Sequence, residues 1–268
     1  MQIGIAGCGR MGAPMLRALF SSDFPARGFD IRPRSDFGDL PVMDDPLGFA
    51  DGLTHLITVV RDQQETDNLL FDQQKIIEIA VDLKYLIISS TLSPRYVTDL
   101  RDRVPSHIHL IDAPMSGAEI AAQECRLSFM LGGEIEHLET LQPIFDAMGK
   151  TFHHMGAYGA GMQAKVLNNL LAAASTAMTR QVLDWAGQAG LDQRKFLDLV
   201  DASSGQNWLA SGFETIEFAK DGYAPDNTIG ILVKDIQAAL DALPGTADTA
   251  LPQAIQTAIR QLKPLEKN

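Results

Sequence analysis

Three glycines near the start of the chain constrain its fold more than any other feature. A short apolar strand runs directly into Gly7, Gly9 and Gly12, spaced as Gly-x-Gly-x-x-Gly, and then into a helical pattern. The first glycine permits a tight turn, the second lets backbone approach a pyrophosphate, and the third lets helix and strand pack closely. The helix N-terminus offers free N–H groups and a positive dipole end to phosphate. A plain βα turn is the alternative, but the context favours a dinucleotide-binding turn, with Arg10 and Met11 as further cofactor contacts.

An acid follows at the distance that such a fingerprint requires. Asp30 ends the second strand-like run, about 20 residues after the glycines. A carboxylate at that position accepts hydrogen bonds from the ribose hydroxyls of NAD and repels the 2′-phosphate of NADP. Arg32 and Arg34 follow it, and the alternative interpretation is that they hold this phosphate. We favour NAD, with NADP the less expected cofactor, and interpret both arginines as solvated loop charges, because the acid stands at the strand end and the arginines lie beyond it.

The charge of the chain argues against several classes of partner. Its 268 residues include 22 lysines and arginines against 34 aspartates and glutamates, for a net charge of −12. Nucleic acid and anionic membranes are therefore not expected as partners. Apolar runs fall short of the about 18 residues of a membrane span and no signal-peptide pattern is visible, so a cytoplasmic location is expected. The two cysteines and six histidines lack metal-ligand spacing, and no metal is expected.

Strand-like and helix-like patterns alternate through the first half of the chain. Such alternation predicts an α/β fold with a Rossmann-type doubly wound parallel sheet. The predicted strands are 2–6, 26–31, 55–60, 85–89, 107–112 and 127–131.

From about Gly161 onward the pattern is helical only. Apolar residues at steps of four predict one helix over 162–189, about 42 Å long at about 1.5 Å per residue, which is typical of a helix connecting domains or subunits. Further helices are predicted at 193–201, within 212–218, at about 229–243 and at 251–262. Glycines at 156–161 mark the expected boundary. The sequence thus predicts a dinucleotide-binding domain over 1–158 and an all-helical substrate and dimerisation domain over 159–268.

Lys165 is the best candidate for proton transfer. It lies one turn into the long predicted helix, and Asn169 follows four residues later on the same face. A lysine near a helix N-terminus faces the positive end of the dipole, which disfavours its protonated form. Partial desolvation would lower its pKa toward neutrality, where it exchanges a proton with a substrate oxygen. From position alone, a solvated surface lysine is the alternative interpretation.

Five motifs, in order along the chain, resemble those of the β-hydroxyacid dehydrogenase family, which includes 3-hydroxyisobutyrate dehydrogenase and tartronate semialdehyde reductase. The resemblance covers most of the chain, and five ordered motifs are far more specific than one glycine loop. The matching segments are Gly7-x-Gly9-x-Met11-Gly12 with Pro14-Met15, Ser90-Thr91-Leu92-Ser93-Pro94, Asp112-Ala113-Pro114-Met115-Ser116-Gly117, Gly159-x-Gly161-x-x-x-Lys165-x-x-x-Asn169, and Lys234-Asp235.

The resemblance implies an NAD-dependent oxidoreductase that interconverts a small β-hydroxy acid, 3-hydroxyisobutyrate-like or a sugar acid, with its semialdehyde or keto acid. It implies that Lys165 is the general acid and base and that Asn169 orients the substrate. Ser116 and Gly117 would bind the substrate carboxylate through hydroxyl and backbone N–H groups. It also implies a homodimer or homotetramer joined through helices. The remaining implied cofactor contacts are Val60, Arg61, Thr91 and Lys234.

Departures from the family pattern leave the substrate open. Ala118 stands where the family usually has a second glycine, and Cys125-Arg126 replaces Gly-Thr. An inward-pointing Arg126 would bind a second carboxylate or a hydroxylated tail, whereas an exposed one would bind neither. Two other functions stay open: an imine reductase of the same fold, which Lys165 disfavours, and a non-catalytic dinucleotide-binding regulator.

Overall fold

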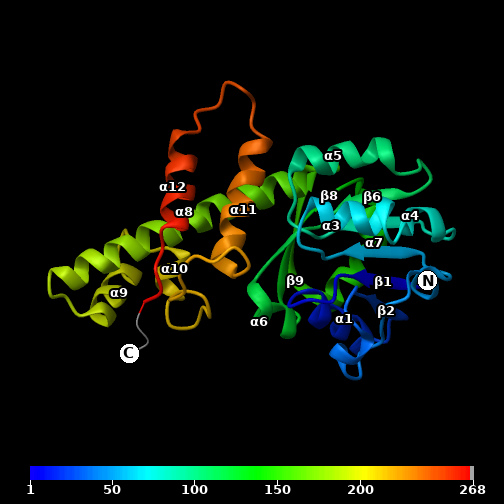
Figure 1. Ribbon diagram of the computed structural model, residues 1–268, viewed down its shortest axis with the longest axis horizontal. Coiled ribbons are helices and arrows are strands. Elements are labelled where there is room, and N and C mark those ends of the chain that lie inside the picture. Colours follow the sequence, from blue (N-terminus) through cyan, green and yellow to red (C-terminus); the bar gives the residue numbers. More distant parts are fainter. Residues whose placement is uncertain (266–268) are drawn as a thin grey trace. The chain divides into compact units, whose positions relative to one another are not determined.

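The computed structural model describes residues 1–265, which form two compact units. Unit 1 comprises Met1–Lys165 and unit 2 begins at Val166. The division lies inside the long helix α8 (Ala160–Gln188), which Figure 1 shows in green to yellow. The domain boundary after residue 158 stays a prediction.

Within the described residues, unit 1 contains one sheet of nine strands. Its order is β3-β2-β1-β4-β5-β6-β8-β7, and β9 pairs with β8. The first six strands run parallel, whereas β8 is antiparallel to β6 and β7. This order, with its reversal between β1 and β4, is that of dinucleotide-binding folds, in which ligands bind beyond the carboxyl ends of the strands. The strands are β1 Ile3–Ala6, β2 Ala26–Phe29, β3 Val42–Met43, β4 His55–Thr58, β5 Tyr85–Ile88, β6 His109–Asp112, β7 Met115–Ser116, β8 Leu127–Gly132 and β9 Gly149–Gly156.

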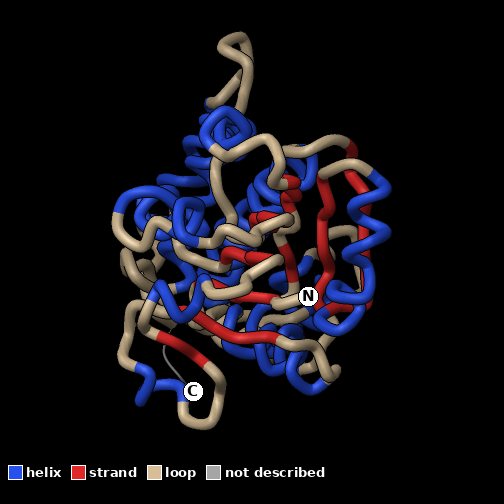
Figure 2. Tube along the Cα trace, turned by 90° about the vertical axis from the view of Figure 1, so that its right-hand side faces the viewer, coloured by secondary structure: helices blue, strands red, loops and turns tan. Residues whose placement is uncertain are grey.

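Helices cover both faces of the sheet, as the views in Figures 1 and 2 show. Successive strand residues point to opposite faces, so strands buried on both sides contribute to two cores. Ile5 and Ile57 share one core with helices α1 and α7, and Leu56 and Leu86 share the other with α5. The predicted doubly wound fold is confirmed. The helices of unit 1 are α1 Gly12–Ser21, α2 Pro46–Ala50, α3 Gln63–Asp67, α4 Ile76–Ile79, α5 Pro94–Arg103, α6 Ala118–Gln123 and α7 Ile135–Met148, with a 3₁₀ turn at Arg34–Phe37 and a π turn at Asn68–Asp72.

Three strands escaped prediction, for physical reasons. Strands β3 and β7 have two residues each, too few to display an alternating pattern. Strand β9 is longer, but it pairs with β8 only, and most of its side chains are exposed. It therefore lacks the apolar alternation by which a half-buried strand is identified. The six predicted strands are all present, each within one or two residues at its ends.

Unit 2 is entirely helical among its described residues, as predicted. Besides most of α8 it contains α9 Gln193–Asp201, α10 Trp208–Ser211, α11 Thr228–Asp241 and α12 Ala250–Arg260. The helix expected within 212–218 was wrong: Asn207 accepts hydrogen bonds from the N–H groups of Leu209 and Ala210, and this N-cap starts a short helix earlier in the chain. No helix in the described part of the chain is long and apolar enough to cross a membrane.

Candidate active site

The glycine turn after β1 has the geometry expected for a dinucleotide site. Gly7 has a φ of 93°, and a Cβ added to Gly12 would lie 1.8 Å from the carbonyl oxygen of Gly7. These two positions require glycine because of the turn and the close approach of α1. A Cβ on Gly9 would meet nothing within 4 Å, so the middle of the loop faces open space. The loop thus fits a pyrophosphate; Arg10 is exposed beside it, and Met11 is half-buried against the core.

Asp30 lies directly after β2 and is bonded to the glycine loop. Its Oδ2 accepts a hydrogen bond of 2.9 Å from the N–H of Cys8, inside the glycine motif. Burial raises the pKa of Asp30, but hydrogen bonds from Arg32, the charge of Arg32 and the Cys8 N–H outweigh burial and hold that pKa below its ordinary value. The carboxylate is therefore ionised at neutral pH and suited to accept hydrogen bonds from ribose.

Arg32 is not the free loop charge that the sequence suggested. Its Nε lies 3.0 Å from Asp30 Oδ1, its Nη2 donates to the carbonyl of Cys8, and its guanidinium lies over the ring of Phe37. Arg34 is exposed, and its backbone N–H donates to Asp44. Asp30 thus forms an ion pair with Arg32, one of the two arginines considered as ligands of the 2′-phosphate of NADP.

Buried hydroxyls gather at the carboxyl ends of β4 and β5. Among the described residues, the hydroxyls of Thr58, Ser89 and Ser90 are buried and have no hydrogen-bond partner. Buried polar groups without a partner are rare, and a bound ligand is one way to satisfy them. The hydroxyls follow the edge of the sheet at which dinucleotides bind. Only Ser90 belongs to a segment that the sequence analysis singled out.

The other predicted cofactor residues of unit 1 lie at the same edge. Val60 and Thr91 are half-buried after β4 and β5. Arg61 is exposed, and its N–H donates to Glu65 Oε2 at 2.8 Å. Together with the glycine loop and the unpaired hydroxyls, these residues fit an elongated polar ligand such as NAD(P).

Ser116 and Gly117 form the turn between β7 and α6. Ser116 is half-buried and pairs with Ser128 of β8, and Gly117 has a φ of 135°. The turn begins four residues after the end of β6, on the carboxyl side of the parallel strands. Arg126 does not add a cation here: it is half-exposed and forms an ion pair with Glu124.

Lys165 is buried, with 7% of its surface exposed, at the end of unit 1. Few lysines in proteins are buried to this extent unless their ammonium group has a specific partner or task. The alternative of a solvated surface lysine is therefore wrong. Helix α8 places it near its N-terminus, as the sequence analysis predicted.

Asn169 and Lys234 belong to unit 2, where a third residue joins them. The side-chain amide of Asn169 donates to Asp235 Oδ2 at 2.6 Å, and Lys234 Nζ lies 3.1 Å from Asp235 Oδ1. Asp235 is only 3% exposed. It fixes the orientation of the Asn169 amide, a role that the sequence could not show because the two residues are 66 positions apart.

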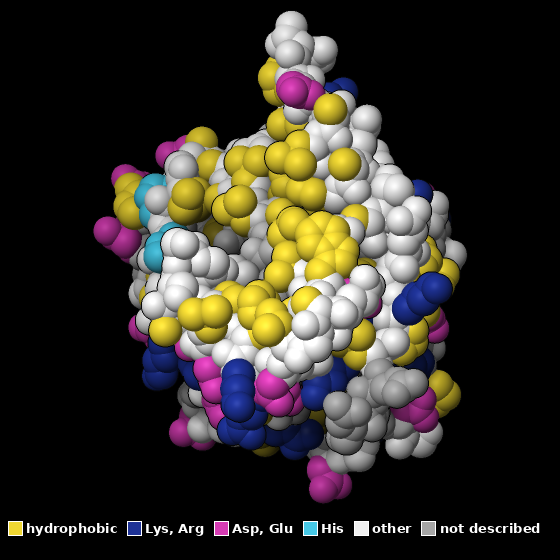
Figure 3. Space-filling view, turned by 90° about the vertical axis from the view of Figure 1, so that its left-hand side faces the viewer, with side chains coloured by type: hydrophobic (Ala, Val, Ile, Leu, Met, Phe, Trp, Pro, Cys, Tyr) yellow, Lys and Arg dark blue, Asp and Glu magenta, His cyan; other side chains and the backbone are white. Residues whose placement is uncertain are grey.

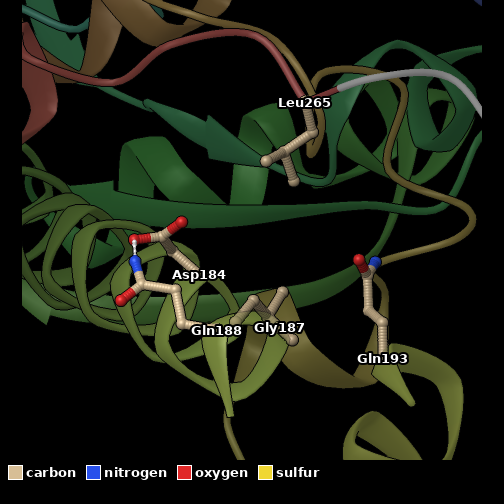
Figure 4. Close-up of a pocket in the computed structure, with 6 residues that line it drawn as sticks. Asp184, Gly187, Gln188, Gln193 and Leu265 are labelled. Carbon is tan, nitrogen blue, oxygen red and sulfur yellow. Dashed lines mark hydrogen bonds between the residues drawn. The ribbon is translucent and has the colours of Figure 1, made fainter. Parts of the chain in front are cut away.

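A hollow of about 430 Å³ in unit 2 contains none of the predicted site residues (Figure 4). It is wide open and lies between α8, the start of α9 and Leu265. In the wall of the hollow, the side-chain amide of Gln188 donates a hydrogen bond of 2.8 Å to Asp184 Oδ2. We do not assign this hollow to the active site.

Two family models match the chain. Residues 2–156 match the NAD binding domain of 6-phosphogluconate dehydrogenase. Residues 159–262 match a model described as NAD-binding of NADP-dependent 3-hydroxyisobutyrate dehydrogenase. The chain belongs to the β-hydroxyacid dehydrogenase family. As a member of this family it is an NAD(P)-dependent oxidoreductase, in agreement with the glycine turn and the sheet order.

Similar proteins agree with this assignment. A 3-hydroxyisobutyrate dehydrogenase of Pseudomonas aeruginosa is 28% identical over 249 residues, covering 89% of this chain and 84% of the relative. An L-threonate dehydrogenase of Cupriavidus necator is 26% identical, covering 89% and 82%. The solved structure of a Mycobacterium tuberculosis 3-hydroxyisobutyrate dehydrogenase with L-serine has a TM-score of 0.79 at 24% identity, covering 98% of this chain and 97% of the other, which shows the shared fold.

Proposed function

We propose that this family member interconverts a small β-hydroxy acid and its semialdehyde or keto acid, with Lys165 as general acid and base. The observation that carries the proposal is the burial of Lys165 near the start of α8, in a chain that has a dinucleotide turn. A lysine amine that meets the substrate oxygen can take or return a proton there. Bound NAD(P) would supply or accept the hydride.

The residues of the chain account for the remaining steps. In the oxidation direction, the neutral amine of Lys165 takes the proton of the substrate hydroxyl. The carbon that bears this hydroxyl gives up a hydride, which NAD(P) would accept. In reduction, the ammonium returns a proton to the forming alkoxide. Asn169, held by Asp235, would orient the substrate through its amide. Ser116 and the Gly117 N–H would hold the carboxylate, since a small anion needs several donors.

A spectrophotometric screen tests this function. Hydroxy acids of three and four carbons, including 3-hydroxyisobutyrate and threonate, are offered with NAD and with NADP, and reduced nicotinamide is followed by absorbance. Turnover of at least one acid is expected. If only cyclic imines with NADPH react, the imine reductase alternative holds; binding of cofactor without any turnover would favour the non-catalytic regulator.

We propose NAD as the preferred cofactor, because the pKa of Asp30 is held below its ordinary value and the residue directly follows β2, the position of the ribose-binding acid in dinucleotide folds. The kcat/KM with NAD is expected to exceed that with NADP. Replacing Asp30 with alanine removes the repulsion of the 2′-phosphate and also frees Arg32, so the ratio of the two kcat/KM values should fall by about 10-fold or more. Steady-state kinetics with both cofactors measure it.

The matched control for this prediction is the Arg32→Ala variant. It leaves the carboxylate in place and should keep the preference for NAD. A wild-type preference for NADP that Arg32→Ala or Arg34→Ala abolishes would contradict the proposal and assign these arginines to the phosphate.

We propose that copies of the chain associate through α8, as a dimer or tetramer. Figure 3 shows hydrophobic side chains gathered on one face of the molecule. On α8, Leu167, Leu171, Met178 and Trp185 are large apolar residues with 43–71% of their surface exposed. Their spacing of four and seven places them on one stripe of the helix, a pattern that a second helix covers.

Light scattering should give a molar mass of at least twice the 29.2 kDa of one chain. The Leu171→Glu variant should have a lower molar mass than the wild type. A wild-type protein that is monomeric at all concentrations would exclude this assembly. The cytoplasmic location stays a prediction.

A further inference from the structure

Asp112 is a buried carboxylate to which the sequence analysis gave no role. It is the last residue of β6 and is fully buried. Its Oδ1 accepts a hydrogen bond of 2.7 Å from the N–H of Gly159, and its Oδ2 accepts one of 2.5 Å from the N–H of Met162. Both oxygens thus accept backbone hydrogen bonds. Burial raises the pKa of Asp112 above its ordinary value, although the N–H groups of Gly159, Met162 and Gly161 oppose that rise.

These contacts attach the start of α8 to the end of β6. The first N–H groups of a helix have no partner within the helix, and a residue just before it usually caps them. Here Gly159 precedes α8 and has no side chain, so the cap comes from Asp112, 47 residues earlier in the chain. A negative charge at a helix N-terminus is also favoured by the dipole. A distant cap fixes the helix in space as well as satisfying its N–H groups.

Two glycines make the attachment possible. A Cβ on Gly132 of β8 would lie 2.1 Å from Asp112 Oδ1. A Cβ on Gly161 of α8 would lie 2.4 Å from the carbonyl oxygen of Met130 and 3.0 Å from Asp112 Oδ2. Any residue other than glycine at positions 132 and 161 would therefore push helix α8, the Asp112 carboxyl group and strand β8 apart. We call Asp112, Gly132 and Gly161 the α8 anchor.

The α8 anchor lies between the two parts of the site that unit 1 contributes. Lys165 follows Met162 by less than one turn of α8, and Ser116 follows Asp112 by four residues. The same carboxylate thus sets the start of the helix that carries the amine and the start of the segment that carries the serine.

We propose that Asp112 is a positioning residue, which holds α8 so that the Lys165 amine meets a substrate bound at Ser116. This inference rests on the proposed function, because it assigns Asp112 an effect through Lys165. A displacement of about 1 Å between reacting groups lowers the rate by up to about 100-fold. Asp112 touches neither cofactor nor substrate in this assignment, so its loss acts on kcat.

A double-mutant cycle tests the proposal. Asp112→Asn preserves the shape of the side chain but places an amide NH₂ against backbone donors. It is expected to lower kcat by about 10- to 100-fold, with the Kd of the reduced cofactor and the substrate KM changed less than about threefold. In the Lys165→Ala background the same change should lower the residual rate by less than about threefold, because the group that it positions is gone. Asp192→Asn is the matched control: Asp192 caps α9, which carries no predicted site residue, and kcat should stay unchanged.

The outcomes separate the two proposals. If Lys165→Ala keeps most of the activity, the proposed function of Lys165 fails. If Lys165→Ala is impaired and Asp112→Asn lowers the rate equally in both backgrounds, or not at all in the wild type, the positioning role is overturned. Hydrogen exchange on the wild-type enzyme gives an answer even if Asp112→Asn does not fold. The amides of Gly159 and Met162 should be strongly protected, and exchange as fast as that of a frayed helix end would refute the α8 anchor.

Discussion

Replacing Lys165 with alanine is expected to lower turnover by about 10²- to 10⁴-fold, the usual loss when a positioned general acid or base is removed. The fold and the affinity for NAD(P) should stay nearly unchanged, because the glycine turn, Asp30 and the hydroxyls after β4 and β5 do not depend on this amine. Steady-state kinetics and fluorescence titration with reduced cofactor measure the two quantities. Lys150→Ala, an exposed lysine on β9, is the matched control and should have wild-type kinetics.

Lys165→Arg should be nearly as impaired as Lys165→Ala. A guanidinium keeps the positive charge but does not release its proton near neutral pH, so it fails as a base. The pH profile of kcat/KM for alcohol oxidation should show a rising limb in the wild type that both variants lack. If Lys165→Arg retains most of the activity, proton transfer by this residue is excluded, and its role is to bind the substrate by charge.

The parts of the fold that follow from local sequence were predictable. Strands β1, β4 and β5 bury both faces and so appear as short apolar runs, and the glycine turn and α8 have strong local signals. The failures have a common cause. The two-residue β3 and β7 owe their existence to neighbouring strands, and the start of α10 depends on the Asn207 cap. Tertiary contacts decide such elements, and periodicity does not show them.

The same distinction between local sequence signals and tertiary contacts applies to the candidate site. Lys165, Ser116 and Asp30 lie in motifs that can be recognised from neighbouring residues. The contacts that position the site are not visible in this way. Arg32 was interpreted as a solvated charge, and Asp112 and Asp235, although they lie within matching motifs, act on groups 47 to 66 positions away. A carboxylate that caps a distant helix looks, in sequence, like any acid at the end of a strand. Only its contacts in the folded structure identify it as a helix cap.

Replacing Ser116 with alanine should lower kcat/KM for the hydroxy acid by about 10- to 150-fold. A hydrogen bond to a charged group contributes about 1.5–3 kcal/mol, and the substrate carboxylate would lose one donor. The affinity for NAD(P) should barely change, because Ser116 belongs to the end of β7 and not to the glycine loop after β1 or to the segments after β4 and β5. Initial rates at varied substrate and cofactor separate the two effects.

Two further variants test whether the hydroxyl itself is responsible. Ser116→Thr keeps the hydroxyl at a half-buried position and should recover a large part of the activity. Ser106→Ala makes the same chemical change at an exposed serine and should have no effect. An equal loss of cofactor affinity in Ser116→Ala would instead show that this turn contacts the dinucleotide. The carboxylate would then have to be held by other donors, because the cation offered by Arg126 is already paired with Glu124.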